Sequence, residues 1–340
     1  MTSTLRHRLL LTVTVVCSVV AGLALVETLL RASGYTEAGR LPDTRPGEPT
    51  TNIPDEVLGW RAKPGRYRIP PWAPNLPPII MTIWPDGSRA TGMERIERSR
   101  EVVTIGDSFT QGWAISDEET YAWKLQTRFP AVEVVNLGTA GYNGVQSLLR
   151  LQQHFAAHPK PPELVIYGFN DDQERRNVGE GAWVAMLALV ARRGMVRLPY
   201  CLPDGNGGLT IYPPFGFPLW PLRNSSAIVP ILEKAAFRIA THGREPQKRR
   251  ATELLIERMS AVVRERGSRL LVALLLDVPE VAAHYTEYLG ARGIDVLDCR
   301  IPGFSFAEMV PGEGHPNGLA NSKWADCLAP VLEQRLAQPH

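Results

Sequence analysis

The sequence lacks the short motifs that mark several common enzyme classes. It has no CxxC pair and no cysteine–histidine cluster with metal-ligand spacing, so we expect no metal site. HExxH and Walker motifs are absent, and the glycines at 138, 141 and 144 have the wrong spacing for a dinucleotide-binding loop. GxSxG, the nucleophile elbow of the common α/β hydrolases, is also missing. We therefore expect neither a metal nor a cofactor.

Net charge and cysteine are scarce as well. The 340 residues carry a formal net charge of +2 with scattered basic side chains, which gives no sign of nucleic-acid binding. The densest basic run, Lys248–Arg250, opens a predicted helix and is expected to face solvent. Of the four cysteines, Cys17 lies in an apolar run near the N-terminus. We expect Cys201, Cys299 and Cys327 to be buried small hydrophobes, although one disulfide with one thiol left over is the alternative.

The longest apolar run lies at the N-terminus. Leu9–Val26 carries no charge, follows Arg6 and Arg8, and ends at Glu27. As a helix, this run would be about 27 Å long, close to the hydrocarbon thickness of a membrane. The preceding positive charges predict an N-terminus inside the cell and the bulk of the chain outside. We expect an uncleaved signal anchor; the alternatives are a signal peptide cleaved near residues 22–24 and a buried core helix.

The remainder divides into two regions. Residues 33–100 are rich in Pro, Gly and Arg, and they predict a linker and a small β-ribbon with strands at 59–65 and 79–84. From residue 101 to 340, apolar runs typical of buried strands alternate with helical stretches, interrupted by an insert at about 177–247. The insert has aromatic residues among prolines, which favour either a stacking platform for a sugar or a packed surface loop.

The alternation predicts the fold class. The expected strands are 102–105, 132–135, 164–167, 270–276 and 294–297, and the expected helices are 118–128, 144–157, 251–266, 279–291 and 317–336. Strands that alternate with helices form a parallel sheet covered on both faces. Five such strands suit a three-layer α/β/α sandwich of the flavodoxin-like type, whose reactive groups gather outside the carboxyl ends of the strands.

Four polar blocks follow expected strands or precede the last helix. They are Gly106-Asp107-Ser108-Phe109, Asn136-Leu137-Gly138-Thr139-Ala140-Gly141, Gly168-Phe169-Asn170-Asp171 and Gly314-His315-Pro316-Asn317. In this order the blocks resemble the SGNH (GDSL-type) serine hydrolase family, from about residue 102 to the C-terminus. A "GW..KPG" and a "DG.R" segment ahead of them are similar to those of its membrane-anchored bacterial members. The resemblance implies the SGNH hydrolase fold and gives the 33–100 region a role as packing flap or substrate lid.

The resemblance also assigns roles. A serine hydroxyl is a poor nucleophile unless a base takes its proton and donors stabilise the developing oxyanion. Ser108 matches the family's nucleophile and His315 its base. The Ser108 N–H, the Gly141 N–H and the Asn170 side chain match the oxyanion donors, with Gly138 as the fallback glycine. The structural alternatives are a helix-capping serine, a surface histidine and an asparagine in a turn.

The acid that would orient His315 departs from the family pattern. Family members usually place an aspartate two or three residues before the histidine, whereas here Gly312 and Glu313 stand in that segment. Glu313 is the candidate, because a carboxylate there would fix the histidine tautomer and stabilise the imidazolium. Asp107 and Asp171 are expected to brace loops.

These observations favour a serine esterase that works through an acyl-enzyme. The resemblance implies a single-pass protein of the bacterial inner membrane, with a periplasmic domain that deacylates (deacetylates) an extracytoplasmic carbohydrate or another ester. A polysaccharide O-acyltransferase with the same residues is an alternative, because the acyl-enzyme is shared and only the acceptor differs. A non-catalytic SGNH-like scaffold or binding protein is the third hypothesis, favoured by Gly312 alone.

Overall fold

The centre of the molecule is a five-stranded parallel sheet. The computed structural model describes residues 3–35, 47–190, 196–276 and 278–337. The strands are β5 (Glu101–Gly106), β6 (Glu133–Asn136), β7 (Leu164–Phe169), β10 (Leu270–Leu274) and β11 (Asp295–Asp298). Their order in the sheet is β11-β10-β7-β5-β6, and every neighbouring pair is parallel. Numbered along the chain this is 2-1-3-4-5, the flavodoxin-like order.

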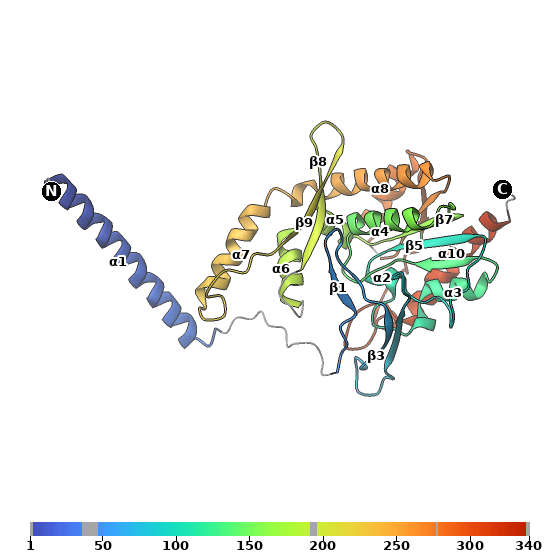
Figure 1. Ribbon diagram of the computed structural model, residues 1–340, viewed down its shortest axis with the longest axis horizontal. Coiled ribbons are helices and arrows are strands. Elements are labelled where there is room, and N and C mark those ends of the chain that lie inside the picture. The colour runs from blue at the N-terminus through green and yellow to red at the C-terminus, as the bar shows by residue number, and fades with distance from the viewer. Residues whose placement is uncertain (1–2, 36–46, 191–195, 277, 338–340) are drawn as a thin grey trace.

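Helices cover both faces of this sheet, as expected. They are α2 (Ser108–Gln111), α3 (Tyr121–Arg128), α4 (Gly144–Ala157), α5 (Asp172–Asn177), α8 (Lys248–Glu265), α9 (Pro279–Gly290) and α10 (Gly318–Leu336). Side chains of α4, α8 and α9 pack on one face, and side chains of α3 and α10 pack on the other (Figure 1). The predicted α/β fold class with about five parallel strands is therefore confirmed.

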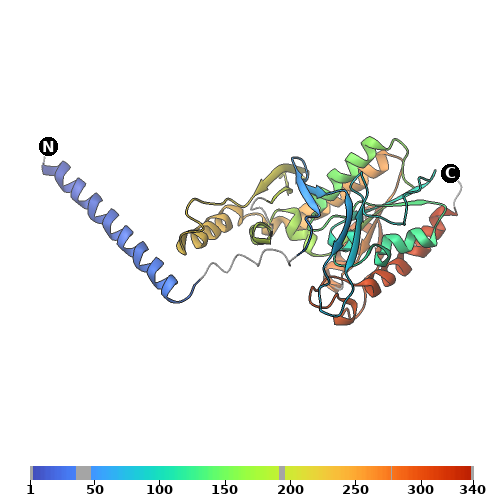
Figure 2. The ribbon, with the colours of Figure 1, turned by 60° about the horizontal axis from the view of Figure 1, so that its bottom comes forward.

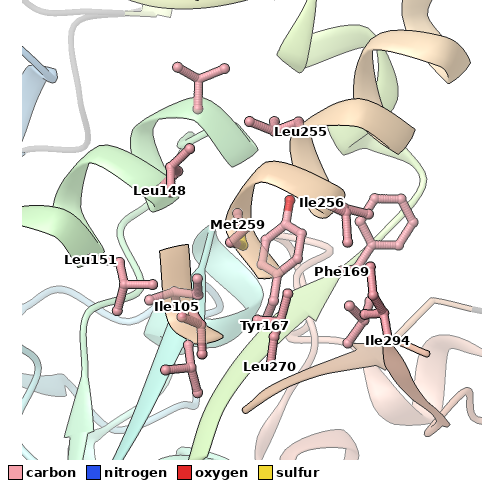
Figure 3. Close-up of a cluster of buried hydrophobic side chains, with 14 of the residues drawn as sticks. Ile105, Leu148, Leu151, Tyr167, Phe169, Leu255, Ile256, Met259, Leu270 and Ile294 are labelled. Atoms are coloured by element: carbon pink, nitrogen blue, oxygen red, sulfur yellow. The ribbon is translucent and has the colours of Figure 1, made fainter. Parts of the chain in front are cut away.

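The strands divide their side chains between the two cores by simple alternation. Successive side chains of a strand point to opposite faces. Tyr167 and Phe169 accordingly join the core beneath α8, with Ile105 from β5 beside them (Figure 3). Ile166, which directly precedes Tyr167, joins the other core, where Trp324 of α10 is fully buried. Both faces of β7 are buried, which explains its unbroken apolar sequence.

A long helix, α1 (Ser3–Ala32), precedes the rest of the fold. Its segment Leu5–Ala32 spans 28 residues; the most apolar 18-residue stretch within it has a mean hydropathy of 2.7, and none of that stretch is buried in the molecule. It projects away from the sheet and its covering helices (Figure 1). By length and composition this helix is able to cross a membrane, whereas its orientation and its retention in the mature protein stay predictions.

The region before the sheet forms two short ribbons instead of one. β1 (Asn52–Asp55) pairs with β2 (Gly59–Ala62), and β3 (Gly65–Ile69) pairs with β4 (Ile79–Ile83), both antiparallel. The predicted ribbon of 59–65 with 79–84 is therefore wrong in its pairing, although both segments contain strands. The cause is a tight turn after β1, where the Asp55 carboxylate accepts the N–H groups of Val57 and Leu58. A turn this short closes a local hairpin at little entropic cost.

The insert contains two helices and a hairpin: α6 (Gly181–Val190), β8 (Arg197–Pro203), β9 (Leu209–Gly216) and α7 (Ile228–Thr241). On the hairpin, Tyr200 stacks on Tyr212 with ring centroids 4.7 Å apart, and the Arg244 guanidinium lies 4.0 Å from the Tyr200 centroid. These rings are engaged with one another and with a cation. This arrangement favours the packed surface loop over the sugar platform.

The cysteines are arranged as one disulfide and one leftover thiol. Cys299, just after β11, is bonded to Cys327 in α10, while Cys201 is buried and reduced. The expectation of three buried small hydrophobes is therefore wrong for Cys299 and Cys327. Packing of α10 on the end of the sheet brings their Cα atoms to 5.7 Å, a separation that suits a disulfide.

Candidate active site

The candidate nucleophile lies where β5 turns sharply into α2. Gly106, the last residue of β5, has φ +152°, and a Cβ atom there would lie 2.9 Å from the Gly168 carbonyl oxygen. Only glycine fits this close approach of two strands. Ser108 then begins α2, which Asp107 caps by accepting the Phe109 N–H at 3.0 Å. Ser108 is thus held in a fixed turn at the carboxyl end of β5.

His315 meets Ser108 from the far end of the sequence. Its Nε2 lies 3.0 Å from the Ser108 Oγ, although 207 positions separate the two residues. This is the distance that proton transfer between a nucleophile and a base requires. The imidazole also packs edge-on against the Phe109 ring, with centroids 6.0 Å apart.

Glu313 reaches the other nitrogen of the same imidazole. Both Glu313 carboxylate oxygens lie 2.8 Å from His315 Nδ1, and Oε2 also accepts the His315 backbone N–H at 2.8 Å. The intervening Gly314 has φ +90°, so the chain turns back tightly and takes up the extra methylene of glutamate. Ser108, His315 and Glu313 therefore form one hydrogen-bonded series.

The geometry of Gly312 explains why a carboxylate stands at 313 and not one position earlier. Gly312 has φ +81°, and a Cβ atom there would lie 2.8 Å from the Trp72 carbonyl oxygen. An aspartate at 312 would combine backbone strain with a clash against main chain. The departure from the family pattern thus coincides with a position that accepts glycine alone.

Trp113 is a neighbour of the site that the sequence did not reveal. Its indole Nε1–H donates to Glu313 Oε1 at 3.0 Å, and its ring packs edge-on against Trp72 at a centroid distance of 6.1 Å. Trp113 stands four residues after the end of the serine block, in the turn after α2. Proximity to Ser108 was the one signal available, because its contact with Glu313 spans 200 positions.

Asp107 joins two further residues behind the nucleophile. Its buried Oδ2 accepts hydrogen bonds from Asn170 Nδ2 at 2.8 Å and from Arg176 Nη1 at 2.7 Å. Arg176 also lies over the Trp183 ring at 4.2 Å. A buried carboxylate needs such partners, so Asp107 braces loops as expected, whereas Arg176 was not foreseen. The Asn170 amide has two hydrogens, and one remains for another acceptor.

The loop that holds the candidate oxyanion glycine is fixed from two sides. Gly141 has φ +77°, and the preceding Ala140 donates its N–H to Gln111 Oε1 at 3.0 Å. The Ala140 carbonyl accepts the Trp60 indole N–H at 3.1 Å, which brings β2 onto this loop. The fallback Gly138 already donates to Asn136 Oδ1 at 3.0 Å.

Two N–H groups are left to serve as donors. Within the described part of the chain, the backbone N–H groups of Ser108 and Gly141 donate to no protein acceptor. Among the described residues no hydrogen bond joins Gly141 or Asn170 to Ser108, so their part in an oxyanion site stays a prediction. Asp171, next to Asn170, makes no capping bond to α5; burial and then the neighbouring Asp172 charge raise its pKa.

Comparison with known proteins places this geometry in context. No family model matches the sequence, and neither does any curated protein. Among solved structures, TesA is 13% identical over 69% of this chain and 99% of its own, with a TM-score of 0.40. A putative lipolytic protein of the G-D-S-L family from Desulfitobacterium hafniense is 14% identical over 68% and 99%, with a TM-score of 0.41. A variant of Axe2, an acetyl xylan esterase from Geobacillus stearothermophilus, is 10% identical over 71% and 96%, with a TM-score of 0.38.

Similarities this low leave the functional argument to the geometry of the site. Within the described residues, no group of three or more His, Cys, Asp or Glu side chains is arranged to hold a metal ion. The chemistry that the site can support is that of a serine hydroxyl, an imidazole, a carboxylate and amide donors.

Proposed function

We propose that this chain is a membrane-anchored serine esterase of the SGNH type. The observation that carries the proposal is the series from the Ser108 hydroxyl through His315 to Glu313, with contacts of 3.0 and 2.8 Å. A serine at a surface or capping site has no need of an imidazole at its hydroxyl and a carboxylate behind that imidazole. Acyl transfer needs all three groups in this order.

The proposed reaction follows from these contacts. His315 Nε2 takes the Ser108 proton as Oγ attacks the acyl carbon, and Glu313 holds the Nδ1–H tautomer and stabilises the imidazolium. The imidazolium then protonates the departing alcohol, and water, activated by the same imidazole, hydrolyses the acyl-enzyme. The Ser108 and Gly141 N–H groups and the Asn170 amide would stabilise the oxyanion, each contributing about 3–4 kcal/mol.

The proposed setting is the outer side of the bacterial inner membrane. Basic residues precede the apolar run of α1, which favours an N-terminus inside the cell and the α/β domain in the periplasm. The Cys299–Cys327 disulfide fits an oxidising compartment. The proposed substrate, an acetylated carbohydrate or a related ester, rests on the resemblance of the four sequence blocks. We propose that the chain has three parts: the membrane anchor (1–32), the linker and ribbon region (33–100), and the hydrolase domain with its insert (101–340).

The scaffold and acyltransferase hypotheses differ in the support that they have. The scaffold hypothesis rested on the missing aspartate at 312, and the contact of Glu313 with His315 removes its support. The acyltransferase would use the same acyl-enzyme, so only the acceptor distinguishes it from an esterase. We therefore propose the esterase and leave acyl transfer as an outcome of the test.

The decisive experiment compares serine variants of the full-length protein in detergent. Wild type should react with a fluorophosphonate probe and hydrolyse p-nitrophenyl acetate, and Ser108→Ala should lose both activities. Ser260→Ala, in α8 away from the site, is the matched control and should keep both. Equal labelling and turnover by wild type and Ser108→Ala would refute the proposal. Release of acetyl groups from glycans, as opposed to their transfer to glycans, then separates esterase from acyltransferase.

The anchor has its own test. Alkaline extraction removes peripheral proteins from membranes and leaves spanning helices in place. We expect the wild-type chain to stay in the membrane pellet. Release into the supernatant would contradict an uncleaved transmembrane helix.

A further inference from the structure

Helix α7 of the insert carries apolar residues on its exposed side. Ile231, Leu232 and Ile239 face solvent, with exposed fractions of 38%, 47% and 78%. The buried side of the same helix includes Glu233 and Phe237. A surface helix of a soluble domain normally places its apolar stripe inward and its polar residues outward. The exposed apolar stripe of α7 is therefore unfavourable if it faces only water.

The loop before α7 extends this surface. Leu219, Trp220 and Leu222 are exposed, Leu222 by 70%, and Leu222 adopts φ +66°, which is rare for a bulky side chain. The Trp220 N–H donates to Glu233 Oε1 at 2.8 Å, so the loop is tied to the helix. We call the exposed apolar set the foot: Leu219, Trp220, Leu222, Ile231, Leu232 and Ile239.

The foot is attached to the end of the membrane helix. Glu27 follows directly on the apolar run of α1, and its carboxylate accepts the Ala227 N–H at 2.9 Å, the Ile228 N–H at 3.1 Å and the Ser226 hydroxyl at 2.8 Å. A carboxylate at a helix N-terminus complements the helix dipole. α7 starts beside the end of α1 and leads away from it at a steep angle, not alongside it (Figures 1 and 2). Its first turn is thus fixed at the level where the apolar run stops.

We propose that the foot lies in the interface of the lipid bilayer, beside the point where α1 leaves the membrane. This inference rests on the proposed anchoring by α1. Apolar helices that lie in the interface bury their apolar face at the boundary of headgroups and acyl chains, and tryptophan favours that depth. The contacts of Glu27 join the foot to the membrane helix. A docking site for another protein would not need to lie beside that helix, so this position favours the membrane as the occupant. The insert would hold the candidate active site at a fixed height above the membrane.

The test is photo-crosslinking of the full-length protein in phosphatidylethanolamine–phosphatidylglycerol vesicles. Benzoylphenylalanine is introduced either for Leu232 in the foot or for Leu319 in α10. These two leucines are exposed to the same degree, 47% and 49%, and Leu319 lies on the α/β domain outside the insert. After irradiation, we expect about tenfold more lipid adducts at position 232 than at position 319, because only the foot would contact acyl chains.

A second arm links the probe to the foot. With benzoylphenylalanine in place of Ile239, the double change Leu222→Glu and Leu232→Glu should reduce lipid adducts several-fold, while p-nitrophenyl acetate turnover stays at the level of the probe protein alone. Equal lipid adducts at 232 and 319 would overturn the proposal, as would adducts at 232 that join two copies of the chain or another protein. Release of the chain by alkali would remove the anchor on which the proposal rests. Fluorophosphonate labelling of Ser108 in the same sample reports the esterase site separately.

Discussion

The α/β core and the insert differ in how much apolar surface they expose, although both bury charge in pairs. The core gathers most of its apolar side chains in two buried clusters and buries charge in pairs: Asp107 is enclosed between Asn170 and Arg176, and Arg89 is buried against Asp117 at 2.8 Å. The insert also buries a charge pair, Glu233 with Arg223 at 3.0 Å, yet it exposes the apolar foot. Buried charge pairs add little stability but fix geometry where polar groups must be aligned. The difference assigns chemistry to the core and contact with surroundings to the insert.

The loop that carries Glu313 and His315 illustrates the rigidity of the core. The Val310 N–H donates to the His315 carbonyl at 2.7 Å, and the Asn317 N–H donates to the Glu308 carbonyl at 2.8 Å. The Cys299–Cys327 disulfide closes the chain around the same loop. A site held this way needs little reorganisation during reaction.

The largest expected effect comes from the acid of the site. Glu313→Gln should lower kcat for p-nitrophenyl acetate by about 10³–10⁴-fold, because an amide no longer holds the Nδ1–H tautomer or stabilises the imidazolium. The matched change in the insert is Glu233→Gln, which alters another buried carboxylate. It should lower the melting temperature and leave kcat per folded molecule near wild type. Similar kcat values for the two variants would contradict the assignment of the chemistry to the core and not to the insert.

The sequence predicted the parts of the site that depend on local pattern. Strand alternation and the polar blocks placed Ser108, His315 and Glu313 at one edge of a parallel sheet. Contacts between distant segments left no local pattern: Trp60 meets Ala140 across 80 positions, and Trp113 meets Glu313 across 200. The ribbon pairing failed for a different reason: it depends on a local turn at Asp55, whose carboxylate accepts the N–H groups two and three residues further on, and the prediction overlooked this turn.

The next effect concerns stability. Replacing both Cys299 and Cys327 by alanine should lower the free energy of unfolding by about 3–4 kcal/mol, because the disulfide closes a loop of 28 residues. Urea denaturation of the oxidised protein measures the loss. Cys201→Ala, which removes a buried thiol at the border of insert and core, should cost less. If Cys201→Ala lowered the free energy of unfolding more than the double replacement, the stability of the core would not depend on the Cys299–Cys327 disulfide that encloses the His315 loop.

A smaller effect is expected at Trp113. Trp113→Phe keeps an aromatic ring against Trp72 but removes the N–H that donates to Glu313. A hydrogen bond to a charged group contributes about 1.5–3 kcal/mol, and only the part that is stronger in the transition state, where Glu313 must stay aligned with the imidazolium, lowers the barrier; we expect kcat to fall by about tenfold. Trp220→Phe in the foot is the matched control and should leave kcat unchanged. A comparable fall in both variants would mean that the foot contributes to the chemistry.

The smallest expected effect is a pH dependence of stability that arises from the Glu308 carboxylate. Hydrogen bonds from Lys323 and Ser305 lower the pKa of Glu308 from 4.5 to about 2. Because the folded-state pKa lies below the ordinary value, this carboxylate stabilises the fold above about pH 4.5, and its contribution disappears as the pH falls toward 2. Glu308→Gln should therefore lose less stability than wild type between pH 5 and pH 3, as measured by urea midpoints. Glu245→Gln in the insert, where an exposed carboxylate lies 3.8 Å from Lys248, should follow wild type. Equal slopes for wild type and Glu308→Gln would mean that backbone hydrogen bonds and the disulfide hold the His315 loop without help from this ion pair.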